Sequence, residues 1–509
     1  MSRVVAVIGG GPAGLYAARL LKLADPALEV VVHERTGETK ETFGFGVGLT
    51  ESTMRNLAAA DAETAEQIRD ASFAGHNLEL RGTSSAATLH GARNLAIGRA
   101  TLLEILSRAA IAAGVDVKRG SKAAAGSVRA DVVVAADGVR SATRRKLAAE
   151  LGVTARLGRT RFVWCGAEFA VDSAFFSSVE TERGLFVAHA YPYAADRSTF
   201  LIEVDEQTWA TAGLAAYDAA TPVGQTDEAS VRLLEKVFAE DLRGGRLLTN
   251  RTRWGRFTNL SLTRWSTDNT VLLGDAAHTA HYTLGSGTKL ALEDSIALAE
   301  ALAGGATLGA AFAAYEARRR PPVERFKLLA GRSQAWWDSY RLRANWPVEL
   351  LALSYMTRSG NLTISQYAAE QLEATRHALA WLDPKVPPRA DELDDWVLAL
   401  PLRRAGIQLS RRGLSVADFH GEPERVEWTE HDVWGEHADR EIRQLGESTR
   451  ASVLVTGPDD PSLLGARIDL AERLKLQTQR CVGVALPAVE RAHAAATVAA
   501  RRADFVVLT

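Results

Sequence analysis

Apolar and polar positions near the start of the chain predict a strand, a helix and a second strand. Residues 4–8 are apolar on both faces and β-branched, which is typical of a fully buried strand. Residues 12–24 have helical spacing, and Pro12 suits the first helical position because no N–H is needed there. Residues 28–33 predict the second strand, which ends at Glu34. This order is that of a unit with parallel strands.

The periodicity changes further along the chain. Residues 100–113 predict a helix, residues 115–118 a short strand and residues 130–136 a buried strand that ends at Asp137. Between residues 156 and 256, strand-like segments separated by turns predict an inserted antiparallel sheet. These strands are 161–169, 184–191 and 198–204, and a helix is expected at 230–239.

The second half of the chain is predicted to be mainly helical and then α/β. A strand at 271–273 runs into Gly274 and Asp275, and the helix that follows ends at residues 304–305. Residues 310–345 are expected to be helical with an interruption at Pro321 and Pro322, and further helical segments reach residue 381. After a linker at 383–388, the expected elements are strands at 451–455, 482–486 and 504–508 and helices at 462–474 and 488–502.

Composition narrows the class of protein. The 509 residues include 47% hydrophobic and 24% charged positions, which is ordinary for a globular chain. The net charge of −2 gives no footprint for nucleic acid or an anionic membrane. The two cysteines, Cys165 and Cys481, exclude a disulfide framework and a metal cluster. We therefore expect a cytoplasmic protein without a transmembrane segment, without a metal site and with no nucleic-acid partner.

The turn after the first strand contains the spacing G-x-G-x-x-G. Gly9 allows a tight turn, Gly11 lets a pyrophosphate approach the backbone, and Gly14 lets the helix and strand pack closely. The helix that follows offers free N–H groups to phosphates. Glu34 lies twenty residues after Gly14, where a carboxylate can accept hydrogen bonds from a ribose. The five features in this order predict a dinucleotide site.

Three other segments are candidates for ligand contacts. Residues 43–49 alternate glycines with bulky apolar residues, including Phe45, which fits either backbone beside a flat ligand or a loop with buried anchors. Arg99 at a helix start fits either a bound phosphate or a solvated side chain. The glycines at 274, 285 and 287 again join a strand to a helix, and a second phosphate or ring contact is the natural interpretation.

Together these motifs resemble the single-component flavoprotein aromatic hydroxylases, the group that includes para-hydroxybenzoate hydroxylase. The resemblance covers roughly residues 1–381. It implies an α/β fold: a Rossmann-like FAD-binding domain with an inserted substrate sheet, a helical segment and a small C-terminal α/β domain. The implied boundaries are 1–155, 156–256, 257–382 and 383–509. The residues that the resemblance assigns to FAD are Gly9, Gly11, Pro12, Ala13, Gly14, Glu34, Arg35, Arg99, Asp137, Gly138, Gly274, Asp275, Gly285, Gly287, Thr288 and Lys289.

The resemblance also implies the chemistry. NAD(P)H would reduce FAD, O₂ would add to give a flavin hydroperoxide, and an electron-rich ring would attack its distal oxygen. His281 and Tyr282 are expected near the flavin ring, and His281 is the better general base near neutral pH. A structural hydrogen bond to backbone is an equal alternative for His281. Candidates for lining the substrate pocket are Phe45, His189, Tyr191, Glu203 and Arg325.

One run departs from most of this family. His281 stands where most members have proline, and Lys289 where most have asparagine. Residues 278–289 instead resemble the salicylyl-CoA 5-hydroxylases and anthraniloyl-CoA monooxygenases, with the violacein-pathway hydroxylases related. This implies conversion of salicylyl-CoA to gentisyl-CoA. A free aromatic acid, anthraniloyl-CoA or an indole are the alternative substrates, and a homodimer is compatible with the sequence.

The remaining segments leave alternatives open. Residues 401–409 and 488–508 are similar to the first and last parts of an old-yellow-enzyme barrel, but the tail is far too short for about 250 residues and is expected to be a non-catalytic remnant. The basic residues between 318 and 343 fit an anionic nucleotide or, with more weight, a solvated helix face. A flavin halogenase would carry a Trp-x-Trp-x-Ile-Pro run, which is absent here. A flavin-bound redox sensor is the non-enzymatic alternative.

Overall fold

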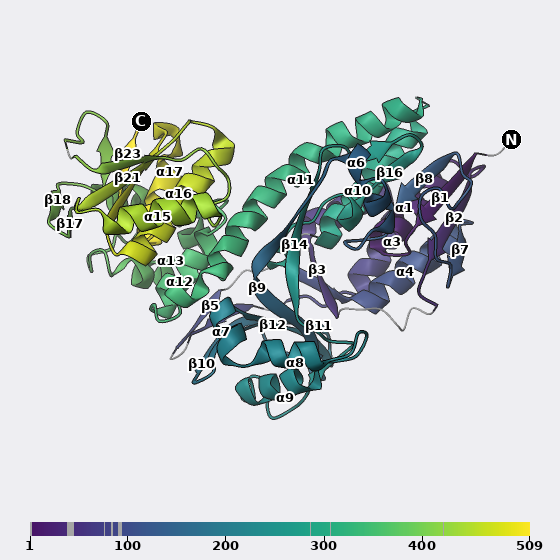
Figure 1. The fold of residues 1–509 in the computed structure, drawn as a ribbon, viewed down its shortest axis with the longest axis horizontal. Helices are drawn as coiled ribbons and strands as arrows, with labels where there is room; N and C mark the ends of the chain where they lie inside the picture. Colours follow the sequence, from purple (N-terminus) through teal and green to yellow (C-terminus); the bar gives the residue numbers. More distant parts are fainter. Residues whose placement is uncertain are drawn as a thin grey trace. The chain divides into compact units, whose positions relative to one another are not determined.

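The chain divides into two compact units in a computed structural model that describes residues 3–37, 45–75, 77–82, 85–89, 94–285, 287–305, 307–420 and 422–509 (Figure 1). Unit 1 comprises Met1–Leu78 and Ala92–Ala330, and unit 2 comprises Glu79–Gly91 and Gly331–Thr509. The predicted loop residues Phe43 and Gly44 lie outside the described ranges. Backbone compactness thus gives two units, with one boundary inside a long helix and a short segment, Glu79–Gly91, assigned to the second unit. The four-part division made from the sequence stays a prediction.

A six-stranded sheet forms the centre of the first part of unit 1. Its order is β15-β16-β8-β1-β2-β7, and β1 pairs in parallel with both β2 and β8. β16 continues the parallel pairing on β8, and β15 is antiparallel to β16. The strands are β1 (Val4–Ile8), β2 (Glu29–Glu34), β7 (Asp116–Arg119), β8 (Val132–Ala135), β15 (Ser266–Thr267) and β16 (Thr270–Leu272). The predicted strand–helix–strand start is therefore confirmed.

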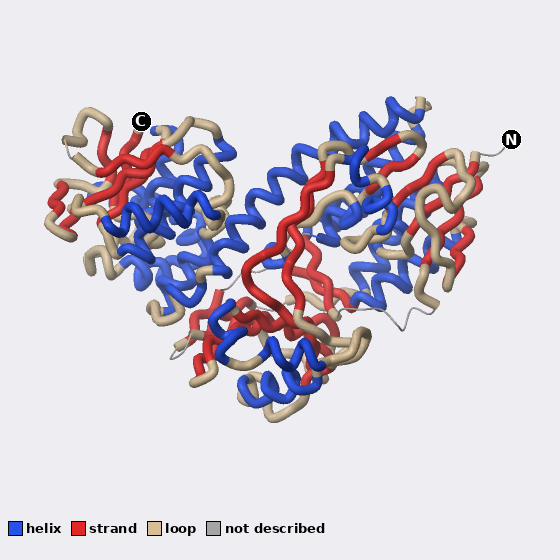
Figure 2. The backbone as a smooth tube through the Cα atoms, viewed as in Figure 1, coloured by secondary structure: helices blue, strands red, loops and turns tan. Residues whose placement is uncertain are grey.

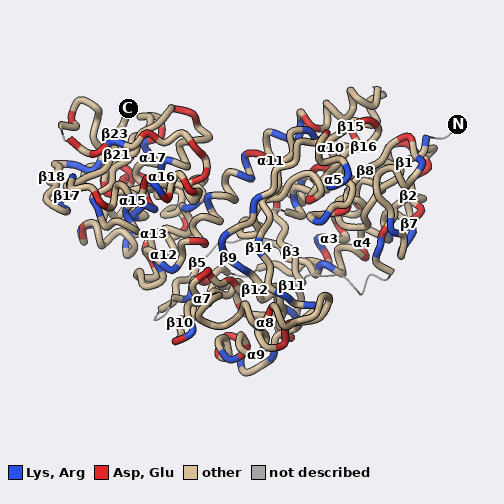
Figure 3. Tube along the Cα trace, viewed as in Figure 1, with Lys and Arg blue, Asp and Glu red and all other residues tan. Residues whose placement is uncertain are grey.

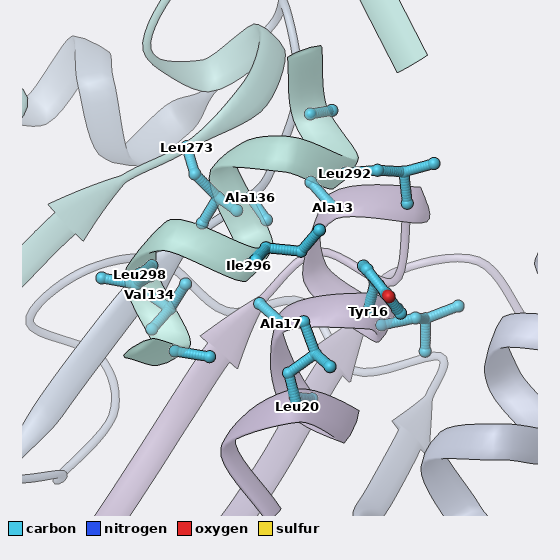
Figure 4. Packing of buried hydrophobic residues seen from close by; sticks show 14 of the residues in the cluster. Ala13, Tyr16, Ala17, Leu20, Val134, Ala136, Leu273, Leu292, Ile296 and Leu298 are labelled. Atoms are coloured by element: carbon cyan, nitrogen blue, oxygen red, sulfur yellow. The ribbon is translucent and has the colours of Figure 1, made fainter. Parts of the chain in front are cut away.

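Helices α1 (Pro12–Ala24) and α10 (Gly287–Ala303) pack against each other beside this sheet. Figure 4 shows Ala13 and Ala17 of α1 close to Ile296 of α10, with Val134 of β8 in the same apolar cluster. Small residues on α1 let the two helices approach closely, and α4 (Arg99–Ala112) contacts α1 as well. The core thus holds the turn after β1 and the turn after β16 in place together.

The predicted inserted sheet is also confirmed, and it has more strands than the sequence indicated. Among its strands the order is β13-β9-β12-β11-β10, all antiparallel, and β14 pairs with β9. The strands are β9 (Val153–Ala167), β10 (Ala174–Thr181), β11 (Gly184–Ala194), β12 (Arg197–Val204), β13 (Leu247–Leu248) and β14 (Gly255–Leu262). One face packs on the helices α7 (Glu206–Thr211), α8 (Leu214–Ala220) and α9 (Glu228–Val237). The other face carries polar and aromatic side chains.

Shorter elements complete unit 1. β3 (Gly46–Thr50) pairs with β6 (Asn94–Gly98) in antiparallel register. The others are α2 (Glu51–Ala60), α3 (Ala62–Asp70), α5 (Ala142–Lys146), α6 (Ala148–Leu151) and the 3₁₀ turns η2 (Gly274–Ala276) and η3 (Tyr282–Leu284). Figure 2 shows the helices and strands of each unit by type.

The predicted break at Pro321 and Pro322 is wrong, because helix α11 (Leu308–Asp338) continues through both prolines. Both prolines are exposed, so the carbonyl groups that lose a hydrogen bond can face water. The opposite side of the helix is held by buried Tyr315 and Val323. Tertiary packing therefore overrides the local helix-breaking tendency.

Unit 2 contains a second sheet of five parallel strands in the order β19-β23-β22-β21-β20. The strands are β19 (Gly413–Ser415), β20 (Glu424–Glu427), β21 (Ser452–Thr456), β22 (Cys481–Leu486) and β23 (Phe505–Leu508), and β17 (Leu402–Arg404) and β18 (Ile407–Leu409) form a hairpin. The helices are α12 (Val348–Thr357), α13 (Ile364–Leu379), α14 (Leu393–Ala399), α15 (Glu436–Glu447), α16 (Pro461–Thr478) and α17 (Arg491–Ala499). Short strands β4 (Leu78–Arg81) and β5 (Ala86–Leu89) and turns η4 (Tyr340–Leu342), η5 (Ala390–Glu392) and η6 (Ala488–Glu490) complete the described elements.

The expectation of a solvated basic face between residues 318 and 343 is wrong for three arginines. Arg319 lies against Asp294 of α10, while Arg332 and Arg343 lie against carboxylates of α16. Ion pairs with carboxylates far away in the sequence make their burial tolerable. Among the described residues, no helix combines the length and apolar character needed to cross a bilayer.

Candidate functional site

The three glycines after β1 have three different surroundings. A Cβ on Gly9, where φ is 109°, would lie 2.3 Å from the carbonyl oxygen of Ala136, and one on Gly14 would lie 2.0 Å from that of Gly9. A Cβ on Gly11 would meet nothing within 4 Å. Gly9 and Gly14 therefore make the turn tight, and Gly11 leaves an open approach to the backbone.

Helix α1 begins at the buried Pro12 and Ala13, and Gly11 caps it without a side-chain hydrogen bond. The first N–H groups of the helix are therefore available to an external acceptor, and the helix dipole favours an anion there. The open approach at Gly11 and this uncapped helix start together fit the phosphates of a dinucleotide.

Glu34 lies beside this turn with its carboxylate already oriented. The carboxylate accepts hydrogen bonds from the N–H of Gly10 and the N–H of Thr36, each at 2.7 Å. A carboxylate has further lone pairs, so it can still accept a hydroxyl of a ribose. Arg35, the next residue, has an exposed side chain.

Neighbouring parallel strands bring the other glycine motifs to the same edge. β1, β8 and β16 are adjacent and parallel, so the segments after them lie at one edge of the sheet. Asp137 accepts hydrogen bonds from the N–H groups of Ala142 and Thr143 at the start of α5, while Gly138 adopts a φ of 73°. The structure thus brings together the glycine turn after β1, the Asp137–Gly138 motif after β8 and the Gly274–Asp275 motif after β16.

Arg99 and Asp275 come close enough for their charges to interact. Burial lowers the pKa of the Arg99 guanidinium, and the Asp275 carboxylate opposes that shift. Arg144 donates to the carbonyl oxygens of Asp275 and Ala276, at 3.3 and 2.9 Å. A cation thus stands at the helix start after β6, where the dipole would favour an anion.

Sequence reasoning missed Asp294, which organises the turn after β16. Its buried carboxylate accepts from the N–H of Gly274 at 3.0 Å, lies 2.8 Å from Nε2 of His278 and accepts from Nε of Arg319 at 2.8 Å. Burial raises the pKa of Asp294, but His278 and Arg319 outweigh burial and hold that pKa below its ordinary value. The available signal was a carboxylate within the apolar run of α10.

The remaining residues of this motif have separate positions. Gly285 has a φ of 61°. Gly287 begins α10, and a Cβ added to it would lie 3.9 Å from Asp275 Oδ1. Thr288 is half-buried. The ammonium of Lys289 lies 4.4 Å from the ring centre of Phe326, so this side chain extends toward α11.

A second cluster lies on the face of the inserted sheet that the helices leave uncovered. The Tyr282 hydroxyl donates to Glu203 Oε1, and His189 Nε2 lies 3.6 Å from Glu203 Oε2. Glu203 is only 3% exposed. Burial raises the pKa of Glu203, but His189, His281 and the Tyr282 hydroxyl outweigh burial and hold that pKa below its ordinary value. The structure therefore favours an ionised carboxylate in the cluster.

Aromatic rings surround this carboxylate. Ring centres are 5.0 Å apart for Phe162 and Tyr282, 4.8 Å for Phe257 and His281 and 4.7 Å for Phe176 and His189. Sequence reasoning missed these phenylalanines. The available signal was the alternation in β9, which places Phe162 on the face opposite the buried Val163.

Three predicted substrate residues have other surroundings. The Tyr191 hydroxyl donates to the carbonyl oxygen of Gly46 at 2.7 Å, and burial raises its pKa to about 12. Phe45 packs against Gly166 of β9, where an added Cβ would lie 2.7 Å from Phe45 Cδ1. Arg325 is exposed on α11, and within the described part of the chain it makes no ion pair or hydrogen bond. The Tyr191 hydroxyl is thus held by the backbone of β3, and within the described part of the chain no contact links Arg325 to the carboxylate cluster. The assignment of these residues to the substrate pocket stays a prediction.

The known proteins that this chain resembles agree with this geometry. Residues 2–127 and 116–327 match the FAD binding domain family. The salicyloyl-CoA 5-hydroxylase of Streptomyces sp. is 34% identical over an alignment of 495 positions that covers 93% of this chain and 93% of that protein. The 3-hydroxy-4-methyl-anthranilyl-[aryl-carrier protein] 5-monooxygenase of Streptosporangium sibiricum is 38% identical over 366 residues, 72% of this chain and 97% of that protein.

Solved structures agree at the level of the fold. The crystal structure of a single-residue variant of 2-methyl-3-hydroxypyridine-5-carboxylic acid oxygenase matches with a TM-score of 0.54 and 22% identity, over 74% of this chain and 97% of that one. The open glycine turn, the uncapped helix and the positioned Glu34 fit FAD. The chain belongs to the FAD binding domain family and is an FAD-dependent aromatic monooxygenase.

Proposed function

We propose that this monooxygenase hydroxylates salicylyl-CoA at ring position 5 to give gentisyl-CoA, with NAD(P)H and O₂ as co-substrates. The observation that carries the proposal is the length of the match to salicyloyl-CoA 5-hydroxylase. A match to 93% of this chain extends over most of residues 331–509, whereas the relative named for a carrier-protein substrate covers 72% of this chain. The longer match to the salicyloyl-CoA 5-hydroxylase therefore favours a CoA thioester over a carrier-protein thioester as the substrate.

The FAD contacts follow from the turn geometry. We assign the pyrophosphate to the open backbone at Gly11 and the start of α1, and the ADP ribose to the Glu34 carboxylate. Arg99 at the start of α4 and Asp275 in the turn after β16 are assigned to the pyrophosphate and the ribityl part of FAD, respectively. Bound FAD supplies the redox chemistry that puts one atom of O₂ on the ring.

The aromatic cluster is assigned to the substrate ring. A ring hydroxyl can donate to the Tyr282 hydroxyl, which in turn donates to Glu203 Oε1. The ionised Glu203 can then take up the proton that the ring hydroxyl loses, passed through Tyr282. Loss of this proton makes the ring electron-rich at the carbon that receives oxygen.

His281 is assigned a positioning role beside this pair. Its Nδ1 lies 3.0 Å from the Thr283 hydroxyl, and its ring lies against Phe257 and Tyr282. These contacts hold the imidazole plane in one orientation, and the nearby ring helps to lower the pKa of Glu203. Phe162 and Phe257 exclude water from the place where the ring would lie.

The experiment is a substrate panel with the purified FAD-loaded protein. Salicylyl-CoA, salicylate, anthraniloyl-CoA, anthranilate and an indole acid are each incubated with NADPH or NADH. Product mass and NAD(P)H consumption are recorded together. We expect salicylyl-CoA to gain one oxygen with matched NAD(P)H loss. Turnover of free acids alone would contradict the thioester assignment, and the absence of any substrate-stimulated NAD(P)H loss would favour the redox sensor.

We further propose that residues 383–509 are a shortened, non-catalytic barrel remnant. The last strand, β23, pairs in parallel with β19, as the last strand of a closed (β/α)₈ barrel pairs with its first. The sheet ends at β20 on its other side, so it remains open. No reductase residue is assigned here.

A further inference from the structure

Cationic side chains surround a single carboxylate beside the amino end of β23 in unit 2. Asp504 Oδ1 lies 2.9 Å from Arg404 Nη1 and 2.8 Å from Lys475 Nζ. Its Oδ2 accepts from the N–H of Val482 at 2.9 Å. Arg412 Nη1 donates to the backbone carbonyl of Asp504 at 2.8 Å. Figure 3 shows the basic positions on β17, the strand that carries Arg404.

Positive charge exceeds negative charge in this cluster. Burial lowers the pKa of Lys475, Asp504 opposes that shift, and the nearby charges of Arg404 and Arg501 add to it. The Asp504 carboxylate raises the pKa of Lys475, Arg412 and Arg501 against the effect of burial, which lowers it. A surplus of partly buried positive charge is unfavourable unless an anion neutralises it. The cluster therefore favours an anionic ligand.

Arg501 of this cluster is half-buried and lies near two indole rings. Its guanidinium carbon lies 4.4 Å from the ring centre of Trp381 and 5.6 Å from that of Trp346. The backbone N–H of Arg501 donates to the carbonyl oxygen of Val498, but within the described residues its guanidinium makes no ion pair or hydrogen bond, so the side-chain donors are available. A planar guanidinium with free donors suits a phosphate, and indole faces suit a nucleobase.

Arg412 supplies a second, independent observation. It is only 8% exposed, and its guanidinium carbon lies 5.8 Å from the Trp381 ring centre. Its Nε has no hydrogen-bond partner within the described part of the chain. A buried donor without an acceptor is costly, and a bound anion would supply that acceptor.

The backbone at Arg501 gives a further reason to assign its side chain a role. It follows α17 with a φ of 59°, in the left-handed region where helix ends usually place glycine. Any side chain is strained there, and such strain often marks a functional position.

The cluster also lies at the amino ends of the strands, whereas (β/α)₈ enzymes act at the carboxyl ends. It therefore fits ligand binding rather than catalysis.

We propose that unit 2 binds a phosphorylated adenine nucleotide at this cluster, with the phosphate on Arg501 and Arg412 and the base against the indoles of Trp346 and Trp381. Two molecules of the proposed reaction carry this chemistry: coenzyme A has a 3′-phosphate and NADPH a 2′-phosphate on the ribose. The choice between coenzyme A and NADPH as the natural ligand rests on the proposed function. The existence of the binding site does not depend on that function.

The test is calorimetric titration of the full-length FAD-loaded protein. The probes are adenosine 3′,5′-bisphosphate, adenosine 2′,5′-bisphosphate, adenosine and inorganic phosphate. We expect one bisphosphate to bind at least tenfold more tightly than adenosine or phosphate, and less tightly as salt is raised. Preference for the 3′ or the 2′ isomer assigns coenzyme A or NADPH as the source.

Variants locate the binding. Arg501→Gly removes the guanidinium and relieves the backbone strain, so it should fold at least as stably and bind the preferred bisphosphate at least tenfold more weakly. Arg243→Gly is the matched control, because Arg243 also has a left-handed backbone, with φ 54°, and stacks 5.0 Å from Phe169 in unit 1. This control should bind as the parent protein does.

Three results would overturn the proposal: no binding of either bisphosphate, equal affinity for inorganic phosphate, or unchanged binding in Arg501→Gly. The titration contains no aromatic acyl group. Failure of salicylyl-CoA turnover and failure of this nucleotide site would therefore be recorded in separate experiments.

Discussion

Single residues in the turn after β1 show how one amino-acid type serves different needs. Gly9 and Gly14 are required because other backbone atoms occupy the space of a side chain. Gly11 faces open space with an ordinary backbone, at φ −76°, so the protein alone does not require glycine there. The physical reason for Gly11 must come from the cofactor.

Gly11→Ala and Gly14→Ala should therefore fail in different ways. Gly11→Ala should change the free energy of unfolding of the FAD-free protein by less than about 1 kcal/mol, while weakening FAD binding at least tenfold, or about 1.4 kcal/mol. Gly14→Ala should cost about 2 kcal/mol of stability or more, because its Cβ meets Gly9 at 2.0 Å. Urea unfolding and FAD fluorescence titration check both. Equal FAD affinity in Gly11→Ala would contradict the pyrophosphate assignment.

Glu203→Gln tests the proton acceptor on the sheet face. The amide keeps the shape of the carboxylate but cannot take a proton from Tyr282, so kcat/KM should fall by about 10²- to 10⁴-fold with FAD affinity unchanged. Glu180→Gln, an exposed change on β10 of the same sheet, is the control and should be neutral. Steady-state hydroxylation of the best substrate is the measurement. Parent-level turnover in Glu203→Gln would remove Glu203 from the mechanism.

Elements place these residues through strand alternation and helix packing. The register pairs Glu203 of β12 with Phe162 of β9, so both point to the face that α7, α8 and α9 do not cover. The turn after β16 is held in place by a residue from another element. Asp294 on α10 reaches back to this turn and also pairs with Arg319 on α11.

Asp294→Asn should destabilise this pair of helices strongly. Arg319 would lose its fully buried ionic partner and keep only the pair with Glu293, so the loss should lie at the lower end of the range for a broken buried pair, about 3 kcal/mol. Glu300→Gln is the control on the same two helices, because the Glu300–Arg318 pair is exposed and should be worth less than about 1 kcal/mol. Urea unfolding at pH 7 compares the two. Similar losses of unfolding free energy in both variants would contradict the conclusion that Asp294 holds the two helices and the turn after β16 together.

The pH dependence of Asp294 has a defined sign. Its pKa is held below the ordinary value of 3.8, so its contribution is present above that pH and is lost as pH falls below it. In the parent protein, stability should fall with acid in that range, and Asp294→Asn should show a smaller fall. This difference is measured by repeating the unfolding series at low pH.

At the scale of the whole molecule, unit 2 is held by buried ion pairs between distant parts of the sequence. Glu472 on α16 accepts from Arg343 at 2.7 Å and from Arg502 at 2.9 Å. Asp469, one turn earlier, pairs with Arg332 and Arg502. These contacts join the end of α11 and the segment after it to the α/β layer that closes the chain. Residues 331–382 and the tail therefore form one compact unit.

Glu472→Gln should reveal the acid sensitivity of this unit. Burial raises the pKa of Glu472, but Arg343 and Arg502 outweigh it and lower that pKa from 4.5 to about 2. The ionised group thus contributes about 3 kcal/mol above pH 4.5, and this is lost as pH falls toward 2. Unfolding at pH 7 and pH 3 should differ less in the variant than in the parent. An unchanged pH dependence of the unfolding free energy in Glu472→Gln would contradict the role of ionised Glu472 in stabilising unit 2.

The sequence alone determined the elements whose signals are local. The strand at Val4–Ile8, the glycine turn, helix α1 and Glu34 could be predicted because their spacing and backbone requirements lie within about thirty residues. Strands β9, β11 and β12 of the inserted sheet and β21, β22 and β23 of unit 2 were predicted for the same reason, whereas β10, β13, β14, β19 and β20 were missed. The motifs after β8 and β16 were located because parallel strands bring their carboxyl ends to one edge.

Only the tertiary structure decided which side chains meet. Tyr282 and Glu203 are 79 positions apart, and Arg343 and Glu472 are 129 apart, so no periodicity in either segment indicates their contact. Packing also carried α11 through two prolines and turned an apparently solvated arginine stretch into buried ion pairs. Local backbone preferences act between near neighbours, whereas burial and charge act on whatever the folded chain brings together.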